Sequence, residues 1–225
     1  MQYKGIIFDF DGTIFDSEVP EYEAWVEIFR RYDAILPITA WAACVGSSND
    51  KFDVIAYLEN QCNIRVDAGT LYQLQRQLSD ERVAQSKPLP GVIEIIQQAK
   101  EHKLRLAIAS SSPQNWVHTQ LRRLGLVQEF EIICTADDVR NVKPDPELFL
   151  CATKKMGLKP GEVIAFEDSP NGITAALSAG MVCIAIPNEI TRYLDTSHAT
   201  HTFNSMAEIQ LNDLFVRLNS GSKKK

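Results

Sequence analysis

Two carboxylates stand where an apolar run near the N-terminus ends. Asp9 and Asp11 are two positions apart in Phe8–Thr13, so in an extended strand both side chains project to the same side. Two carboxylates buried together require a cation, and oxygen-only ligands favour Mg²⁺ over zinc. A turn or helix-capping role explains Asp11 before Gly12, but it does not explain Asp9 inside the apolar run. The pair therefore predicts a magnesium site.

A second acidic pair and two polar side chains follow other apolar runs. Glu167 and Asp168 come after Val163–Phe166, Lys143 lies between Val142 and Pro144, and Ser110 ends another apolar run. A single lysine or serine in a loop is most often only solvated. The two acidic pairs are what make Lys143 and Ser110 candidates for one charged site.

The elements that must position these residues alternate between strand and helix. Short β-branched runs are typical of strands buried on both faces, and helical periodicity lies between them. We expect strands at Gly5–Phe10, Leu104–Ala109, Glu131–Thr135, Val163–Phe166 and Val182–Ile186. This alternation predicts an α/β fold with a Rossmann-like parallel sheet. The acidic pairs then lie at one edge, beyond the carboxyl ends of the strands, where open α/β sheets bind ligands.

One long interval contains only helical patterns. Between the first two expected strands we predict helices at Val19–Tyr32, Asp50–Gln61 and Ala68–Gln85. We therefore expect an inserted helical domain over residues 16–87, above a core formed by 1–15 and 88–219. Residues 220–225 are expected to be a disordered tail.

Three helices are expected to begin after strands. In Ser112-Pro113, Asp145-Pro146 and Ser169-Pro170, a residue that favours the N-cap precedes a proline suited to the first helical position. Their N-termini would face the same edge and favour a phosphate group there. Good helix capping alone would also explain the pattern.

The composition of the chain limits the partners and the cellular compartment that we expect. The chain has 225 residues and a net charge of −6, which disfavours nucleic acid and anionic membranes as partners. We find neither a signal peptide nor a membrane-length apolar run, so the cytoplasm is the expected compartment. The five cysteines form no C-x-x-C pair and are expected to be reduced. A monomer is the default expectation, and His198 and His201 are interpreted as surface residues.

Four segments, taken in order, resemble the motifs of the haloacid dehalogenase superfamily. They are FDFDGT, ASSS, VKPDPE and FEDSPNG, and the resemblance extends over nearly the whole chain. The helical insert is similar to the cap of the β-phosphoglucomutase-like branch. The resemblance implies a Rossmann-like core with a helical cap, and phosphatase activity on a small phosphorylated metabolite.

The resemblance also implies roles for individual residues. Asp9 resembles the nucleophile that forms an aspartyl-phosphate, and Asp11 resembles the general acid and base. Mg²⁺ would be held by Asp9, the Asp11 backbone carbonyl and Asp168, with Glu167 as an outer partner. Phosphate would be bound by Ser110 and Lys143, assisted by Asn171 or Ser111.

The insert departs from the mutase pattern of this branch. Glu21 occupies the position of a cap histidine, Asn49 that of an arginine, and Leu78 lies near that of a lysine. These departures favour hydrolysis over a phosphosugar mutase, which stays an alternative together with a catalytically idle binding protein. An aspartyl-phosphate receiver domain would lack the insert and the second aspartate.

The substrate itself is less defined by sequence. Sugar phosphates are the first expectation and nucleotides the second, because the insert and not the core selects the leaving group. Glu21 is expected to contact the leaving group, whereas Trp25 is interpreted as a core aromatic. Further candidates on the insert are Ser47, Ser48, Asn49 and Arg76. Hinges at Asp16-Ser17 and Lys87-Pro88 would let the insert close over the site.

Overall fold

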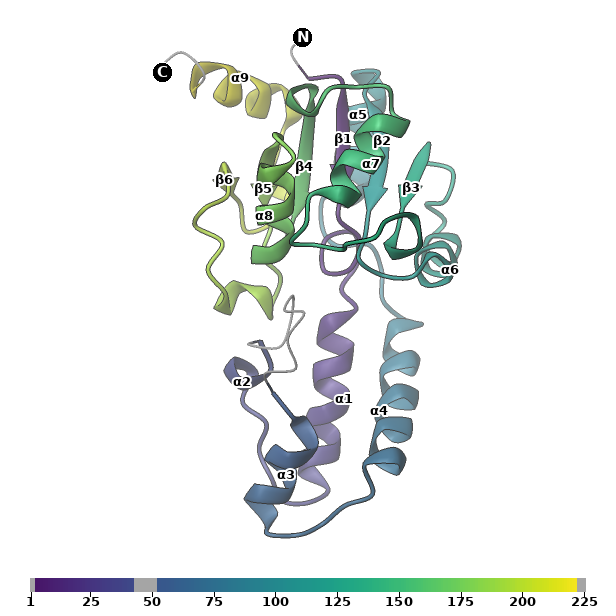
Figure 1. Cartoon of the computed structure of the whole chain (residues 1–225), viewed down its shortest axis with the longest axis vertical. Helices are drawn as coiled ribbons and strands as arrows, with labels where there is room; N and C mark the ends of the chain where they lie inside the picture. The colour runs from purple at the N-terminus through teal and green to yellow at the C-terminus, as the bar shows by residue number, and fades with distance from the viewer. Residues whose placement is uncertain (1–2, 43–51, 222–225) are drawn as a thin grey trace.

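The computed structural model describes residues 3–42 and 52–221. Figure 1 shows two parts, a sheet flanked by helices and an elongated group of helices below it. The first two residues of the predicted helix Asp50–Gln61 lie outside the described residues, as do Ser47, Ser48 and Asn49.

A six-stranded sheet in the order β3-β2-β1-β4-β5-β6 forms the centre of the core. All of its pairings are parallel, which confirms the predicted fold class. The strands are β1 (Gly5–Phe8), β2 (Arg105–Ala109), β3 (Ile132–Cys134), β4 (Val163–Glu167), β5 (Val182–Ala185) and β6 (His201–Thr202). β6 was not predicted, because two residues show no periodicity.

The first strand is shorter than predicted, and its end has a local cause. The backbone N–H of Asp9 still bonds to the carbonyl of Phe166 at 2.9 Å, but the chain then turns, with Ile14 N–H donating to Phe10 O. Asp9 is therefore held by the sheet, whereas Asp11 lies in the turn that follows it.

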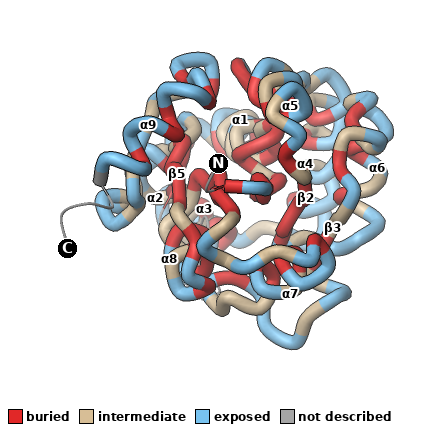
Figure 2. The backbone as a smooth tube through the Cα atoms, turned by 90° about the horizontal axis from the view of Figure 1, so that it is seen from above, coloured by how far each residue is buried: buried red, intermediate tan, exposed pale blue. Residues whose placement is uncertain are grey.

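Successive residues of the strands face opposite layers. Ile6 and Phe8 pack with α5 (Val92–Glu101), α6 (Gln114–Leu124) and α9 (Leu211–Gly221). Ile7 packs on the other face with α7 (Glu147–Lys155) and α8 (Pro170–Ser178). Seen from above in Figure 2, the strands are buried between helices whose outer sides are exposed. This alternation covers both faces of the sheet.

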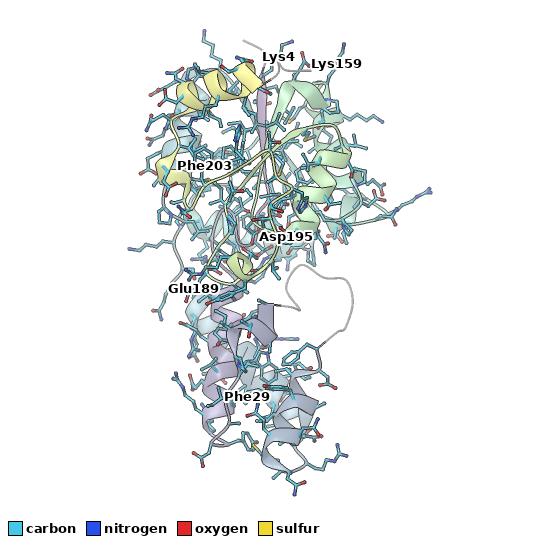
Figure 3. All side chains as sticks on the ribbon, turned by 90° about the vertical axis from the view of Figure 1, so that its left-hand side faces the viewer. Lys4, Phe29, Lys159, Glu189, Asp195 and Phe203 are labelled. Atoms are coloured by element: carbon cyan, nitrogen blue, oxygen red, sulfur yellow. The ribbon has the colours of Figure 1, made fainter. Side chains whose placement is uncertain are left out.

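The insert has its own apolar cluster. Its helices are α1 (Glu18–Arg30), α2 (Ile38–Ala42), α3 (Val54–Cys62) and α4 (Ala68–Val83). The short α2 was not predicted. Trp25, Phe29 and Leu58 are among the buried residues of the cluster, and Figure 3 labels Phe29 well below the sheet. The interpretation of Trp25 as a core aromatic is confirmed, since the side chain is 2% exposed.

The two connections between insert and core pair with each other. Phe15 forms an antiparallel bridge with Pro88, and the Leu89 N–H donates to the Ile14 carbonyl at 2.8 Å. The predicted hinges are thus adjacent in space. Closure of the insert stays a prediction.

Two of the three helices that were predicted to begin with a capping residue and a proline begin at a different residue. Ser169 caps α8 by accepting the Gly172 N–H at 3.1 Å, as expected, with Pro170 in the first turn. Pro146 and Pro113, in contrast, precede the first residues of α7 and α6, so both helices begin one residue later than predicted. Asp145 accepts the Glu147 N–H, whereas the Ser112 hydroxyl bonds to Asp11 and leaves the Gln114 N–H to Asp137.

The C-terminal part also differs from prediction. Ser220 and Gly221, which were expected to belong to a disordered tail, are the last residues of α9. The rest of that expected tail, 222–225, lies outside the described residues. Leu214 and Leu218 anchor this helix on the core. Among the described residues, no helix combines the length and apolar character needed to cross a membrane.

Candidate active site

The loops that leave β1, β2 and β4, together with the segment between β3 and α7, surround a cavity of about 240 Å³. Most of the residues expected to act chemically line it, as predicted for this edge of the sheet. The lining residues are Asp9, Asp11, Glu18, Ser110, Ser111, Ser112, Val142, Lys143, Asp168, Ser169 and Asn171.

Lys143 joins two buried carboxylates. Its ammonium donates to Asp9 and, at 2.6 Å, to Glu167, which is fully buried. Burial by itself would lower the pKa of Lys143, but the two carboxylates outweigh it and raise that pKa. The lysine is therefore a permanent cation beside Asp9, which leaves the other Asp9 oxygen available to attack an electrophile.

Asp11 has a different environment from Asp9. One of its oxygens accepts from the Trp116 indole and the Ser17 hydroxyl, both at 2.8 Å, and the other accepts from the Ser112 hydroxyl at 2.6 Å. Burial raises the pKa of Asp11 and the charge of Asp9 adds to this, while the three hydrogen bonds oppose it. Asp11 is thus a carboxyl group whose partners are neutral, which suits a group that gains and loses a proton.

Three carboxylates lie close together at this edge of the sheet, and two of them, Asp9 and Asp168, line the cavity. One oxygen from each of Asp9, Glu167 and Asp168 lies within 4.8 Å of the others. Burial and the neighbouring acidic groups raise the pKa of Asp168 well above its usual range. Lys143 compensates Asp9 and Glu167 but does not donate to Asp168, so the cluster fits a hard divalent cation.

Glycine leaves room for this cluster at two positions. A side-chain carbon at Gly12, whose φ is +86°, would lie 2.4 Å from an Asp168 oxygen. One at Gly172 would lie 1.9 Å from the Glu167 carboxylate. Both carboxylates therefore occupy space that any other residue would fill.

Ser110, Ser111 and Asn171 line the side of the cavity next to Lys143. Ser110 is 1% exposed, and its hydroxyl oxygen accepts the Ser112 N–H at 3.0 Å, so the hydroxyl proton is directed elsewhere. Together with the N-terminus of α8, these groups supply donors for an anion.

The insert contributes less directly. Glu21 does not line the cavity. Averaged over all its atoms the residue is exposed, but many protein atoms surround its carboxyl group. This burial, followed by the charges of Asp11 and Asp80, raises the pKa of Glu21 to about 7. Arg76 lines a separate hollow along α4 with Tyr72 and Asp80.

Several residues of the site were not predicted from the sequence. Asn188, after β5, donates to Asp168 at 2.9 Å and to Glu18 of α1 at 3.1 Å. Trp116 lies in the first turn of α6, six residues after Ser110. Glu18 directly follows the predicted hinge Asp16-Ser17, and this position was a usable clue. Asn188 and Trp116 act through tertiary contacts that spacing does not encode.

The site is thus built on a parallel sheet that has a helical insert after its first strand. Its carboxylates and its lysine lie at one edge of that sheet. The model of the haloacid dehalogenase-like hydrolase family matches residues 6–186. The chain therefore belongs to the haloacid dehalogenase-like hydrolases.

Individual proteins agree with this membership. The chain is 43% identical to a Bacillus subtilis protein named "Putative phosphatase YhcW" over 217 residues, which are 96% of this chain and 98% of the other. It is 30% identical to the fructose-1-phosphate phosphatase YqaB of Escherichia coli, covering 82% of this chain and 97% of that one. The crystal structure of CbbY from Rhodobacter sphaeroides in complex with phosphate is 25% identical, with a TM-score of 0.70 and coverage of 92% and 96%.

Proposed function

We propose that this chain is a Mg²⁺-dependent phosphatase that hydrolyses a small sugar phosphate through a covalent aspartyl-phosphate on Asp9. The observation that carries the proposal is the position of Asp9, which bonds to the buried Lys143 and lies beside Asp168 in a cavity lined with hydroxyl groups. The names of relatives support the substrate class, since one is a phosphatase of fructose 1-phosphate.

Phosphate binding is assigned to the polar side of the cavity. Ser110, Ser111 and Asn171 supply neutral donors, and Lys143 supplies a positive charge that offsets the negative charge of the substrate. Asp9 and Asp168, with the Asp11 carbonyl, would hold Mg²⁺, and Glu167 would orient Lys143. The bound ion would lower the repulsion between the phosphate and the carboxylates.

The chemical steps are assigned to the two aspartates. An Asp9 oxygen attacks phosphorus while Asp11 donates its proton to the oxygen of the departing alcohol. Asp11, now ionised, then removes a proton from the water that hydrolyses the aspartyl-phosphate. Splitting one displacement into two lets the same carboxyl group act first as acid and then as base.

The helical insert, residues 16–87, is proposed to be a cap that covers the cavity and selects the leaving group. Glu18 supports this assignment, because it belongs to α1 and also lines the cavity. Glu21 is the next candidate, since its carboxyl group is near enough to Asp11 for the two charges to interact.

The test is phosphate release from a panel of sugar phosphates, nucleotides and 4-nitrophenyl phosphate, with Mg²⁺ or with a chelator, for the wild type and Asp9→Asn. We expect Mg²⁺-dependent release that the substitution abolishes, and a mass increase of one phosphoryl group on a peptide containing Asp9 after rapid quenching. Formation of an isomeric sugar phosphate without free phosphate would identify a mutase instead. Absence of any turnover would contradict the proposal and favour the idle binding protein.

A further inference from the structure

The carboxylate of Asp11 accepts hydrogen bonds from three different side chains. A carboxylate offers about four lone-pair positions, two on each oxygen. Trp116 and Ser17 occupy both positions on Oδ1, and Ser112 occupies one on Oδ2. The donors of residues 3–42 and 52–221 therefore leave a single acceptor position, on Oδ2, for a proton.

The three donors are not equivalent. The hydroxyl groups of Ser17 and Ser112 can rotate and accept a hydrogen bond instead of donating one, whereas an indole N–H can only donate. A proton on Oδ1 would need a rearrangement at Ser17, and the Trp116 N–H would still point at that oxygen. Trp116 is thus the residue that keeps Oδ1 unprotonated.

The donors to the two Asp11 oxygens differ in whether they line the cavity. Ser112, the partner of Oδ2, lines the cavity together with Asp11, but Trp116 and Ser17 are not among the lining residues. The donor to Oδ2 thus borders the cavity, whereas neither donor to Oδ1 does.

The Trp116 ring is held firmly enough to impose this arrangement. It lies at the first turns of α6 and packs against Phe15, with ring centroids 6.3 Å apart. Phe15 is fully buried and also contacts Phe10, at 5.2 Å between centroids. The N-terminus of α6 is anchored by the Asp137 carboxylate, which accepts the Gln114 N–H at 2.7 Å.

We propose that Trp116 is a positioning residue for the acid-base step: its indole N–H occupies Oδ1 of Asp11 and so directs the transferable proton to Oδ2, toward the leaving group. The inference rests on the proposed function, because it assigns the origin of the proton in that reaction. Ser112 then positions the oxygen that carries the proton.

The contact itself can be tested without activity. The chain has three tryptophans, so the ¹H–¹⁵N spectrum of the folded protein contains three indole signals that Trp→Phe variants assign. Asp11→Asn replaces a charged acceptor by a neutral one. We expect it to move the Trp116 indole signal upfield and to leave that of Trp25, in the insert, in place. An unchanged Trp116 signal would overturn the proposal.

The catalytic role is tested by the leaving group. Alkyl phosphates need a proton on the departing oxygen, whereas 4-nitrophenolate leaves as a stable anion. Because general acid catalysis contributes about 10²–10⁴-fold, we expect Trp116→Phe to lower kcat/KM for a sugar phosphate by about tenfold or more. The value for 4-nitrophenyl phosphate should fall much less, and Trp116→His, which retains a ring N–H, should recover part of the loss.

The matched control is Trp25→Phe, which makes the same change in the apolar cluster of the insert. It should leave the ratio of the two kcat/KM values unchanged. Equal losses for both substrates in Trp116→Phe would show a merely structural role and overturn the proposal. Failure of the wild type to release phosphate from any substrate would instead refute the proposed function, while the indole signal would still report on the contact.

Discussion

The side-chain amide of Asn188 donates a hydrogen bond to Asp168 at 2.9 Å, and two backbone N–H groups on its other side fix the orientation of this amide. Its carbonyl oxygen accepts the backbone N–H groups of Ile190 and Thr191 at 2.8 and 2.9 Å. The amide nitrogen must therefore face the carboxylates of Asp168 and Glu18. Figure 3 labels the neighbouring Glu189 where the core meets the helical insert. Asn188 thus links the proposed metal site to the insert.

Asn188→Asp should retain the turn but replace the amide donor that faces Asp168 and Glu18 by a carboxylate oxygen. An aspartate can still accept the two backbone N–H groups, but it places a negative charge where Asp168 and Glu18 now receive a donor. Because partners behind a metal ligand contribute about 10–100-fold to metal affinity or activity, we expect a loss of that order in kcat/KM, with a higher Mg²⁺ requirement. Asn212→Asp on the exposed side of α9 adds the same charge and should change neither value. Normal Mg²⁺ dependence in Asn188→Asp would contradict this role.

Lys143→Met should destabilise the protein as well as inactivate it. The substitution leaves Asp9 and Glu167 buried without their cation, and breaking a buried ion pair costs about 3–5 kcal/mol. We expect a loss of that size in the free energy of unfolding, measured by urea denaturation without Mg²⁺. Adding Glu167→Gln to Lys143→Met should recover part of the stability but none of the activity.

An exposed ion pair provides the control for that measurement. Lys4 bonds to Glu162 at 2.6 Å, but its side chain is 57% exposed. Exposed pairs contribute at most about 1 kcal/mol, so Lys4→Met should change stability little. Similar losses for Lys4→Met and Lys143→Met would show that the buried cluster is not specially dependent on its lysine.

Gly172→Ala should disturb Glu167 through space alone. The added methyl group would lie 1.9 Å from that carboxylate, which is fully buried and bonded to Lys143. Because helix propensity favours alanine, any destabilisation must come from this overlap, for which about 1–3 kcal/mol is typical of overpacking. At Gly161 the same methyl group meets no atom within 4 Å, so Gly161→Ala should be nearly neutral in thermal unfolding and phosphate release. A fully active, stable Gly172→Ala would show that Glu167 has room to move.

The sequence predicted the parts of the site that depend on strand order. Asp9, Ser110 and Asp168 follow β1, β2 and β4, and the central position of β1 between the other two brings these residues together. Local periodicity and motif order were sufficient for this result, because parallel strands place their carboxyl ends at one edge.

The remaining contacts depend on how the elements pack. Ser112 was expected to cap a helix, but Asp11 competes for its hydroxyl group at 2.6 Å. The direction of the Trp116 indole is set by the rotation of α6 on the sheet, and Asn188 reaches Asp168 only because β5 lies beside β4. Such contacts depend on tertiary packing that no local pattern in the sequence reports.

Glu21 makes the stability of the fold depend on pH in a defined direction. Burial, and then the charges of Asp11 and Asp80, raise its pKa to about 7 in the folded protein, whereas an unfolded glutamate has a pKa of about 4.3. Between these values the folded state binds more protons than the unfolded state, so this group lowers stability as pH rises from about 4.3 through 7. We therefore expect Glu21→Gln to raise Tm at pH 8 and to have little effect at pH 4.

Solvent near the exposed Glu21 makes this gain in Tm smaller than the full pKa shift implies. Glu101→Gln, on the exposed side of α5, should show no such difference between the two pH values. A Glu21→Gln variant whose Tm follows that of the wild type from pH 4 to pH 8 would show that the carboxyl group of Glu21 is fully solvated.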